Sequence, residues 1–181
     1  MKINFAIFTD ANGKVVLDGG YDVVKGKSIP VPAGLKKLLV PGNKLLANTD
    51  VNKTVKGIVV VDNTPLMLVC APVTNTNADK PRSGYVIFAR LFDKTEAARI
   101  SSITHMTVTF AQSSDRLAGI VVKPQSEAII QGKTTLDDIY GKPALVSTIE
   151  NPRNIYQEGK KDLSYMIGSL IIAGVVFGIA I

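Results

Sequence analysis

Apolar runs rich in β-branched residues alternate with turn residues along most of the chain. Residues 55–62, 66–73 and 83–91 form three such runs, and each predicts a buried strand. Residues 3–8 and 14–17 flank an Asn-Gly dipeptide, which adopts positive φ at low cost and predicts a hairpin. Strands that follow one another at such short spacing predict mostly antiparallel pairing.

Two short helices are expected between the strands. Residues 34–40 form an amphipathic stretch that follows Pro32, a residue suited to the start of a helix. Residues 93–103 predict a second helix, in which Asp93 fits the N-cap and Glu96, three residues later, completes the pattern of a capping box. These helices are expected to flank the strands on one side, as in an α+β domain.

The later part of the chain continues with strands. Residues 106–110 predict one strand, and residues 134–140 and 144–150 predict a hairpin joined by Gly-Lys-Pro. Two interruptions are also expected. The Gly-Gly pair at residues 19–20 is predicted to end the second strand, and residues 155–159 are predicted to form a linker.

The apolar excess of the chain is concentrated at its C-terminal end. Residues 163–181 carry no charge, and about 20 apolar residues are needed to cross a bilayer core. We therefore expect a folded domain over residues 1–159, followed by a juxtamembrane linker and transmembrane helix over residues 160–181. Tyr165 suits the interfacial position of such a helix. A buried core helix is the alternative for this segment.

Composition excludes several classes of site. The 181 residues include 21 basic and 15 acidic residues, which gives a net charge of +6. No Lys/Arg run is longer than two, so we expect no nucleic-acid partner. One cysteine and one histidine cannot form a Cys/His zinc site, an iron–sulfur site or an internal disulfide. We expect no metal and no other cofactor.

Residues suited to catalysis are sparse. His105, the only histidine, lies at a predicted helix-to-strand junction, and no serine lies in a G-x-S-x-G motif. Cys70 lies within a predicted buried strand, where an inert structural thiol is expected. Asp137 and Asp138 are neighbours in a predicted strand, so their side chains point to opposite faces. We therefore expect no enzymatic activity, and a membrane-bound hydrolase is the least favoured class.

Arg90 is the main candidate for binding a ligand, because it is a charged residue within an otherwise apolar predicted strand. Its planar guanidinium suits the carboxylate or phosphate of a ligand. An internal salt bridge or an edge position is the alternative. Tyr85, on the same strand, is the second candidate. The two residues lie five positions apart, so in a regular strand they face opposite sides of the sheet.

Several segments, taken in their order along the chain, resemble the fourth subtype of the CHASE extracellular sensor domains. The sharpest match is residues 83–90, SGYVIFAR, where the family has a glycine, an apolar run and an arginine. Residues 3–16, INFAIFTDANGKVV, resemble the opening strand, Asp-x-x-Gly turn and strand of the family. The other matching segments are residues 29–32, 55–59, 65–69, 71–73, 140–144 and 152–156.

The resemblance implies a PAS-like, single-Cache fold, in which an antiparallel sheet with short flanking helices lies outside the cell between two membrane helices. It also implies a small-molecule ligand and, in the complete protein, a cytoplasmic signalling module such as a HAMP linker, histidine kinase or cyclase. A homodimer is expected, and Gly174 and Gly178 would allow two membrane helices to approach closely. The chain has no tryptophan and lacks the Trp-Asp-Asp-x-Tyr motif of the family. We therefore expect an N-terminally truncated domain that ends in the second membrane helix.

The expected function is that of an extracellular ligand-sensing input domain of a membrane receptor, of the sensor histidine kinase type. Arg90 and Tyr85 are its candidate ligand contacts, and membrane lipid is the expected surrounding of residues 163–181. Movement of the strands is expected to displace the membrane helix. The alternative is a tail-anchored cytosolic interaction or scaffold protein, because the sequence begins without a signal peptide.

Overall fold

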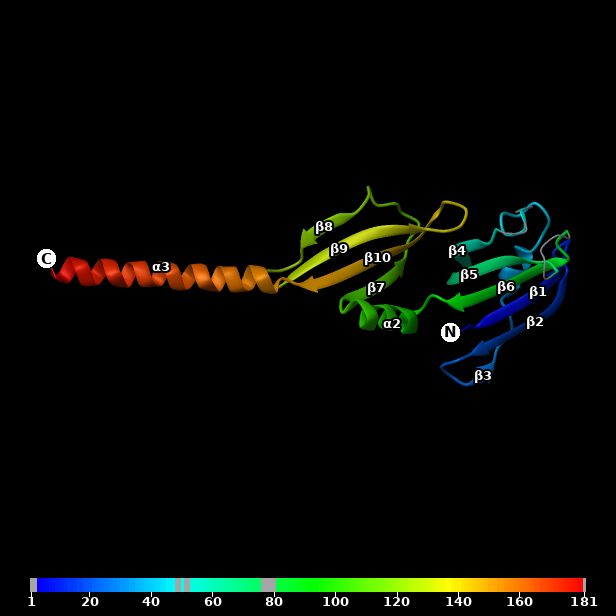
Figure 1. The fold of residues 1–181 in the computed structure, drawn as a ribbon, viewed down its shortest axis with the longest axis horizontal. Helices are drawn as coiled ribbons and strands as arrows, with labels where there is room; N and C mark the ends of the chain where they lie inside the picture. Colours follow the sequence, from blue (N-terminus) through cyan, green and yellow to red (C-terminus); the bar gives the residue numbers. More distant parts are fainter. Residues whose placement is uncertain (1–2, 48–49, 51–52, 76–80, 181) are drawn as a thin grey trace.

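Two antiparallel sheets and three helices make up the computed structural model, which describes residues 3–47, 50, 53–75 and 81–180 (Figure 1). The first sheet has the order β3-β2-β1-β6-β5-β4 and is built from β1 (Phe5–Asp10), β2 (Val15–Asp22), β3 (Lys27–Ser28), β4 (Val55–Val61), β5 (Thr64–Val73) and β6 (Gly84–Leu91). The second sheet has the order β7-β10-β9-β8 and is built from β7 (Thr107–Gln112), β8 (Val121–Pro124), β9 (Ile129–Asp137) and β10 (Pro143–Pro152). The helices are α1 (Ala33–Lys37), α2 (Lys94–Thr104) and α3 (Asn154–Ala180). The predicted α+β class with antiparallel strands is confirmed, and its strands divide between two sheets.

The hairpins form where the turn chemistry predicts them. Gly13 has a φ of 84° in the β1–β2 turn, and the Asp10 carboxylate accepts hydrogen bonds from two backbone N–H groups of that turn. Asp62 and Asn63 both have positive φ, 48° and 60°, in the turn that joins β4 to β5. Two successive residues with positive φ match the twist of the flanking strands. Strands β1 and β2, and strands β4 and β5, therefore pair as hairpins in the first sheet.

The prediction that Gly19-Gly20 ends the second strand is wrong, because β2 continues to Asp22. Gly20 pairs with Phe5 in the β1–β2 ladder. A Cβ atom on Gly20 would lie 2.5 Å from the carbonyl oxygen of Ile29 and 2.9 Å from the ring of Phe5. Glycine is required here by the close approach of neighbouring atoms and does not interrupt the strand.

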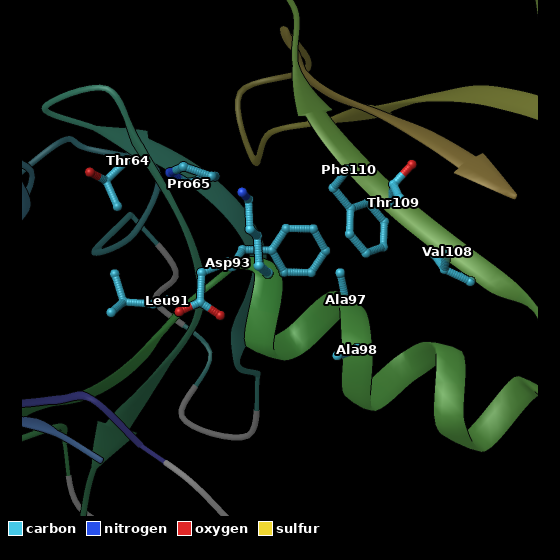
Figure 2. Close-up of a pocket in the computed structure, with 11 residues that line it drawn as sticks. Thr64, Pro65, Leu91, Asp93, Ala97, Ala98, Val108, Thr109 and Phe110 are labelled. Carbon is cyan, nitrogen blue, oxygen red and sulfur yellow. The ribbon is translucent and has the colours of Figure 1, made fainter. Parts of the chain in front are cut away.

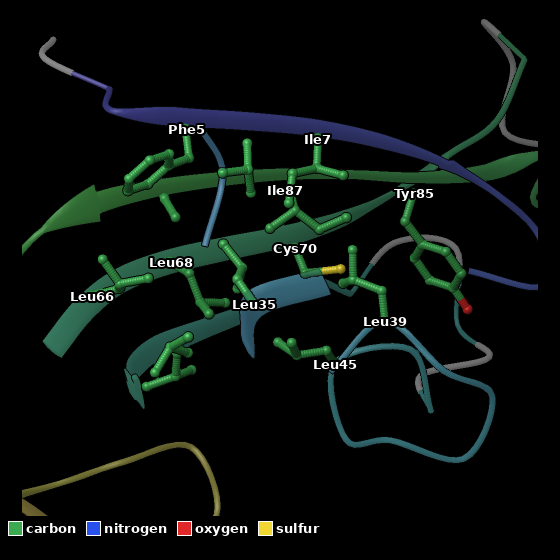
Figure 3. Close-up of a cluster of buried hydrophobic side chains, with 14 of the residues drawn as sticks. Phe5, Ile7, Leu35, Leu39, Leu45, Leu66, Leu68, Cys70, Tyr85 and Ile87 are labelled. Atoms are coloured by element: carbon green, nitrogen blue, oxygen red, sulfur yellow. The ribbon is translucent and has the colours of Figure 1, made fainter. Parts of the chain in front are cut away.

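The main hydrophobic core lies between one face of the first sheet and the segment that contains α1 (Figure 3). Alternate residues of β6 point toward this core, namely Tyr85, Ile87 and Ala89. Leu35 of α1 and Leu45 in the segment after it cover the core and are fully buried. Burial of apolar side chains on this face is the main source of stability of the first sheet.

A smaller core joins the two sheets. Phe92, between β6 and α2, packs against Phe110 of β7 with their ring centroids 4.5 Å apart. Leu145 of β10 belongs to the same buried cluster. The backbone N–H of Ile139 also donates to the carbonyl of Ile58 in β4 at 2.9 Å. The sheets are therefore connected by apolar packing and by a backbone hydrogen bond.

The predicted linker over residues 155–159 is wrong, because these residues belong to α3, which begins at Asn154, one residue after the end of β10. Among the described residues, α3 is the one helix long and apolar enough to cross a membrane. The apolar stretch of α3 is not buried against the rest of the molecule. The alternative interpretation of this segment as a buried core helix is therefore wrong. The domain boundary at residue 159 stays a prediction.

Candidate functional site

Three charged side chains meet between α2 and the first sheet: Arg90 of β6, and Glu96 and Arg99 of α2. We call them the Arg–Glu–Arg cluster. Asp93 positions the helix, because its carboxylate accepts hydrogen bonds from the N–H groups of Thr95 and Glu96 at 3.0 and 3.1 Å. The predicted N-cap is thus confirmed. The side chain of Glu96 is buried under the first turns of α2.

The Glu96 carboxylate bonds to both arginines. The Nε atom of Arg99 lies 3.0 Å from each carboxylate oxygen, and its Nη2 atom contacts Oε1. The Nη2 atom of Arg90 forms a salt bridge with Oε2. In a capping box, the Glu96 carboxylate would accept a hydrogen bond from the backbone N–H of Asp93. It bonds to the two arginines instead, so the predicted capping box is wrong at Glu96. Two guanidinium groups attract the carboxylate more strongly than one backbone N–H.

The cluster carries a net positive charge. Hydrogen bonds from Arg99, and then the nearby charge of Arg90, hold the pKa of Glu96 below its ordinary value even though burial acts in the opposite direction. Glu96 is therefore ionised at neutral pH, and two cations share one anion. The side chain of Glu96 is 1% exposed, whereas Arg90 is 21% and Arg99 49% exposed. The uncompensated charge consequently lies on the solvent side of the cluster.

A hollow of about 370 Å³ opens beside the cluster, and we call it the α2 hollow. Its walls are mainly apolar and come from β5, β6, α2 and Ile3, which lies two residues before β1. Met67, Phe88 and Ile100 are among the large apolar residues that line it. Arg90, Glu96 and Arg99 form its charged side.

A second hollow, of about 580 Å³, lies at the junction of the two sheets (Figure 2). Figure 2 shows Ala97 and Ala98 of α2 on one side, with Val108 and Phe110 of β7 on the other. Helix α2 therefore forms part of the wall of both hollows. The α2 hollow is lined by the Arg–Glu–Arg cluster, which carries a net positive charge, whereas the junction hollow is lined by one acidic and one basic residue, Asp93 and Lys94.

The two predicted ligand contacts lie on opposite faces of the sheet, as their spacing predicts. Arg90 lines the α2 hollow and forms the internal salt bridge that was its alternative interpretation. Tyr85 is 2% exposed within the main core, and its hydroxyl donates to the carbonyl of Leu46 at 2.7 Å (Figure 3). The structure does not bring the two side chains together. A ligand role for either residue stays a prediction.

Glu96 and Arg99 are the members of the site that sequence reasoning missed. Their spacing of three residues on a predicted helix is the signal that was available, because such residues are neighbours on a helix surface. The presence of Arg90 nearby depends on how α2 folds back toward β6, which local sequence does not specify.

The other residues considered for chemistry have structural positions. Cys70 is buried in the main core, and burial raises the pKa of its thiol to about 11. His105 has a φ of 55° and ends α2 in the left-handed conformation. Within the part of the chain that the structure describes, no group of three or more His, Cys, Asp or Glu side chains is placed to hold a metal ion.

The chain is 22% identical over 187 residues to the methanogenesis regulatory histidine kinase FilI of Methanothrix harundinacea (strain 6Ac). The match covers 98% of this chain and 21% of the kinase, so the chain spans about a fifth of the length of this curated relative.

Two solved structures show a more distant likeness. One is a domain of a protein assigned to the sensory box/GGDEF family from Vibrio parahaemolyticus, at 10% identity and a TM-score of 0.49, over 86% of this chain and 74% of that one. The other is the extracellular domain of a protein assigned as the histidine kinase vpHK1S-Z8, at 11% identity and a TM-score of 0.46, over 85% of this chain and 70% of that one. Both TM-scores lie below 0.5, and the function proposed below does not rest on either structure.

The family is shown by a match that covers more than half of the chain. The model of the CHASE4 domain matches residues 1–111, a range that contains the first sheet, α2 and the whole Arg–Glu–Arg cluster. The resemblance that the sequence motifs indicate is thereby confirmed. The chain belongs to the CHASE4 domain family.

Proposed function

We propose that this CHASE4 domain is the extracellular ligand-sensing input domain of a membrane receptor of the sensor histidine kinase type. It binds a small molecule and passes the signal to α3, and it carries no catalytic step of its own. The family match and the histidine kinase relative support this proposal. In the complete protein, a cytoplasmic HAMP linker, histidine kinase or cyclase would receive the signal, and a homodimer would be the signalling unit.

The observation that carries the proposal is a continuous structural path from the candidate site to α3. Helix α2 leads into β7, and the Ser101 hydroxyl ties the two together, since it donates to the carbonyl of Val108 and accepts from its N–H. Strand β7 pairs with β10 from Thr107 to Gln112. Strand β10 then runs into α3 with one intervening residue, Arg153. Displacement of α2 would therefore be transmitted through paired backbone to the membrane helix.

The start of α3 is also held against the second sheet. The backbone N–H of Arg153 donates to the carbonyl of Ala128 in the β8–β9 turn at 2.8 Å. Glu127 of the same turn forms an ion pair with Lys160 of α3 at 2.6 Å. The guanidinium of Arg153 lies 4.0 Å from the ring centre of Tyr156, in the first turn of the helix. These contacts favour movement of α3 together with the sheet.

The orientation of the domain is tested by labelling a new cysteine from outside the cell. Lys123 is exposed on β8, and Cys70, the native cysteine, is buried with a thiol of raised pKa. In intact cells that make the Lys123→Cys variant, we expect a membrane-impermeant maleimide to label the protein as fully as it does in permeabilised cells. The wild-type protein is the control for background labelling at Cys70.

Labelling that appears only after permeabilisation would contradict the proposal. The domain would then face the cytosol, and the tail-anchored interaction or scaffold protein would be the better description.

A further inference from the structure

We propose that the α2 hollow binds an apolar molecule that carries a single carboxylate, and that Arg99 and Arg90 hold this carboxylate. The inference rests on the proposed sensing function and names the class of ligand. It uses the face of the first sheet opposite to the main core, where Phe88 and Arg90 point away from Tyr85 and Ile87.

The charge of the cluster supports an anionic ligand. Arg90 and Arg99 together have ten N–H donors of fixed geometry, and one buried carboxylate cannot use them all. A second carboxylate would complete a neutral set of two cations and two anions. Arg99 is half-exposed, so its outer edge can reach a molecule that enters from solvent. Guanidinium groups bind carboxylates through two parallel hydrogen bonds, which fixes the orientation of the ligand.

The walls of the hollow support an apolar ligand body. Met67, Phe88 and Ile100 offer apolar surface next to the cluster, and the volume of about 370 Å³ suits a small molecule. Burial of an apolar body would also remove water from the ion pairs and strengthen them. A cation would meet the positive charge of the cluster, and a sugar would leave its hydroxyl groups facing apolar walls without partners.

The position of Glu96 gives the ligand a way to act on α2. Arg99 bonds to Glu96 from the next turn of the same helix, whereas Arg90 belongs to β6. A ligand carboxylate that takes N–H groups of Arg99 competes with Glu96 for this side chain. Ligand binding would therefore change the contacts that hold the first turns of α2 against β6.

The test uses hydrocinnamate, a phenyl group on a short chain that ends in one carboxylate. The full chain is inserted into phosphatidylcholine nanodiscs, and binding is followed by isothermal titration calorimetry with empty nanodiscs as the blank. We expect hydrocinnamate to bind. Hydrocinnamyl alcohol, which has a hydroxymethyl group in place of the carboxylate, should bind at least tenfold more weakly, because it cannot form charge-assisted bonds to arginine.

Two substitutions are expected to shift the affinity in opposite directions. Arg99→Gln should weaken hydrocinnamate binding roughly tenfold, and Glu96→Gln should strengthen it, because the internal competitor loses its charge. Arg116→Gln is the matched control. Arg116 is exposed and pairs with Asp137 in the second sheet, so its loss should leave binding unchanged. A cluster that served only to stabilise the fold would not shift the affinity in opposite directions.

Three results would overturn the inference. They are equal binding of the acid and the alcohol, unchanged affinity in Arg99→Gln, and absence of hydrocinnamate binding to the folded wild-type chain. Each of these can occur while Lys123→Cys is labelled from outside the cell. The ligand class would then be wrong while the proposed sensing function stands.

Discussion

Replacing Gly84 with alanine is expected to lower the free energy of unfolding by about 3 kcal/mol or more. Gly84 is the first residue of β6 and pairs with Asp10 of β1. A Cβ atom at this position would lie 2.0 Å from the carbonyl oxygen of Thr9 and 3.0 Å from its carbonyl carbon. Both atoms belong to the backbone, so the contact can be relieved only by separating two central strands. Urea unfolding of the full chain in detergent measures the loss.

Gly132→Ala is the matched control. Gly132 lies within β9, and a Cβ atom there would have no atom within 4 Å. Because alanine restricts the unfolded chain more than glycine does, the substitution is expected to be neutral or to stabilise by up to about 1 kcal/mol. Equal losses for Gly84→Ala and Gly132→Ala would contradict the close approach of β1 and β6.

Glu96→Ala is the second large effect, with an expected loss of about 3 kcal/mol in the free energy of unfolding. Its carboxylate is almost fully buried and is shared by Arg90 and Arg99. Its removal leaves two like charges close together, one of them largely buried, without an anion between them. The same urea titration gives the value.

Glu127→Ala removes a carboxylate from an exposed ion pair with Lys160 and is the control for Glu96→Ala. Its expected cost is below about 1 kcal/mol, because exposed pairs contribute little. A loss of similar size in both variants would show that burial of Glu96 does not determine the effect.

Lowering the pH is expected to reduce the contribution of the Arg–Glu–Arg cluster to stability. The pKa of Glu96 is lowered from its ordinary value of 4.5, so its stabilising contribution is complete above that pH and is lost as the pH falls through the lower pKa of the folded state. The wild-type chain is therefore expected to lose more stability than Glu96→Gln when the pH falls below about 4.5. Parallel losses in the two proteins would contradict the assignment.

Local chemistry predicts much of the secondary structure. The Asn-Gly turn before β2 and the N-cap at Asp93 each depend on a few adjacent residues, and each is present. The prediction that Gly20 helps to end a strand is wrong because glycine is required there by atoms of Ile29 and Phe5. These atoms approach Gly20 only in the folded sheet. The division into two sheets also depends on packing between distant residues, such as Phe92 and Phe110, and no local pattern reports it.

The candidate site could be predicted only in part. Arg90 stands out because a charge in an apolar strand requires a partner. That partner, Glu96, lies on a helix that follows the strand, and its identity depends on the path of the chain through Phe92 and Asp93. Tyr85 is a candidate because it lies on the same strand as Arg90, but the partner of its hydroxyl, the carbonyl of Leu46, lies far away in the sequence.

The distance between the first sheet and α3 tests the central claim, that α3 moves as one body with the sensing fold. Lys56 of β4 and Glu158 of α3 are exposed and can carry spin labels after replacement by cysteine. A variant with Gly-Gly-Ser inserted after Arg153 provides the reference for an uncoupled helix. In nanodiscs, pulsed electron paramagnetic resonance is expected to give one narrow distance distribution for the intact chain and a broad one for the insertion. A distribution as broad in the intact chain as in the insertion variant would contradict transmission from the domain to the membrane helix.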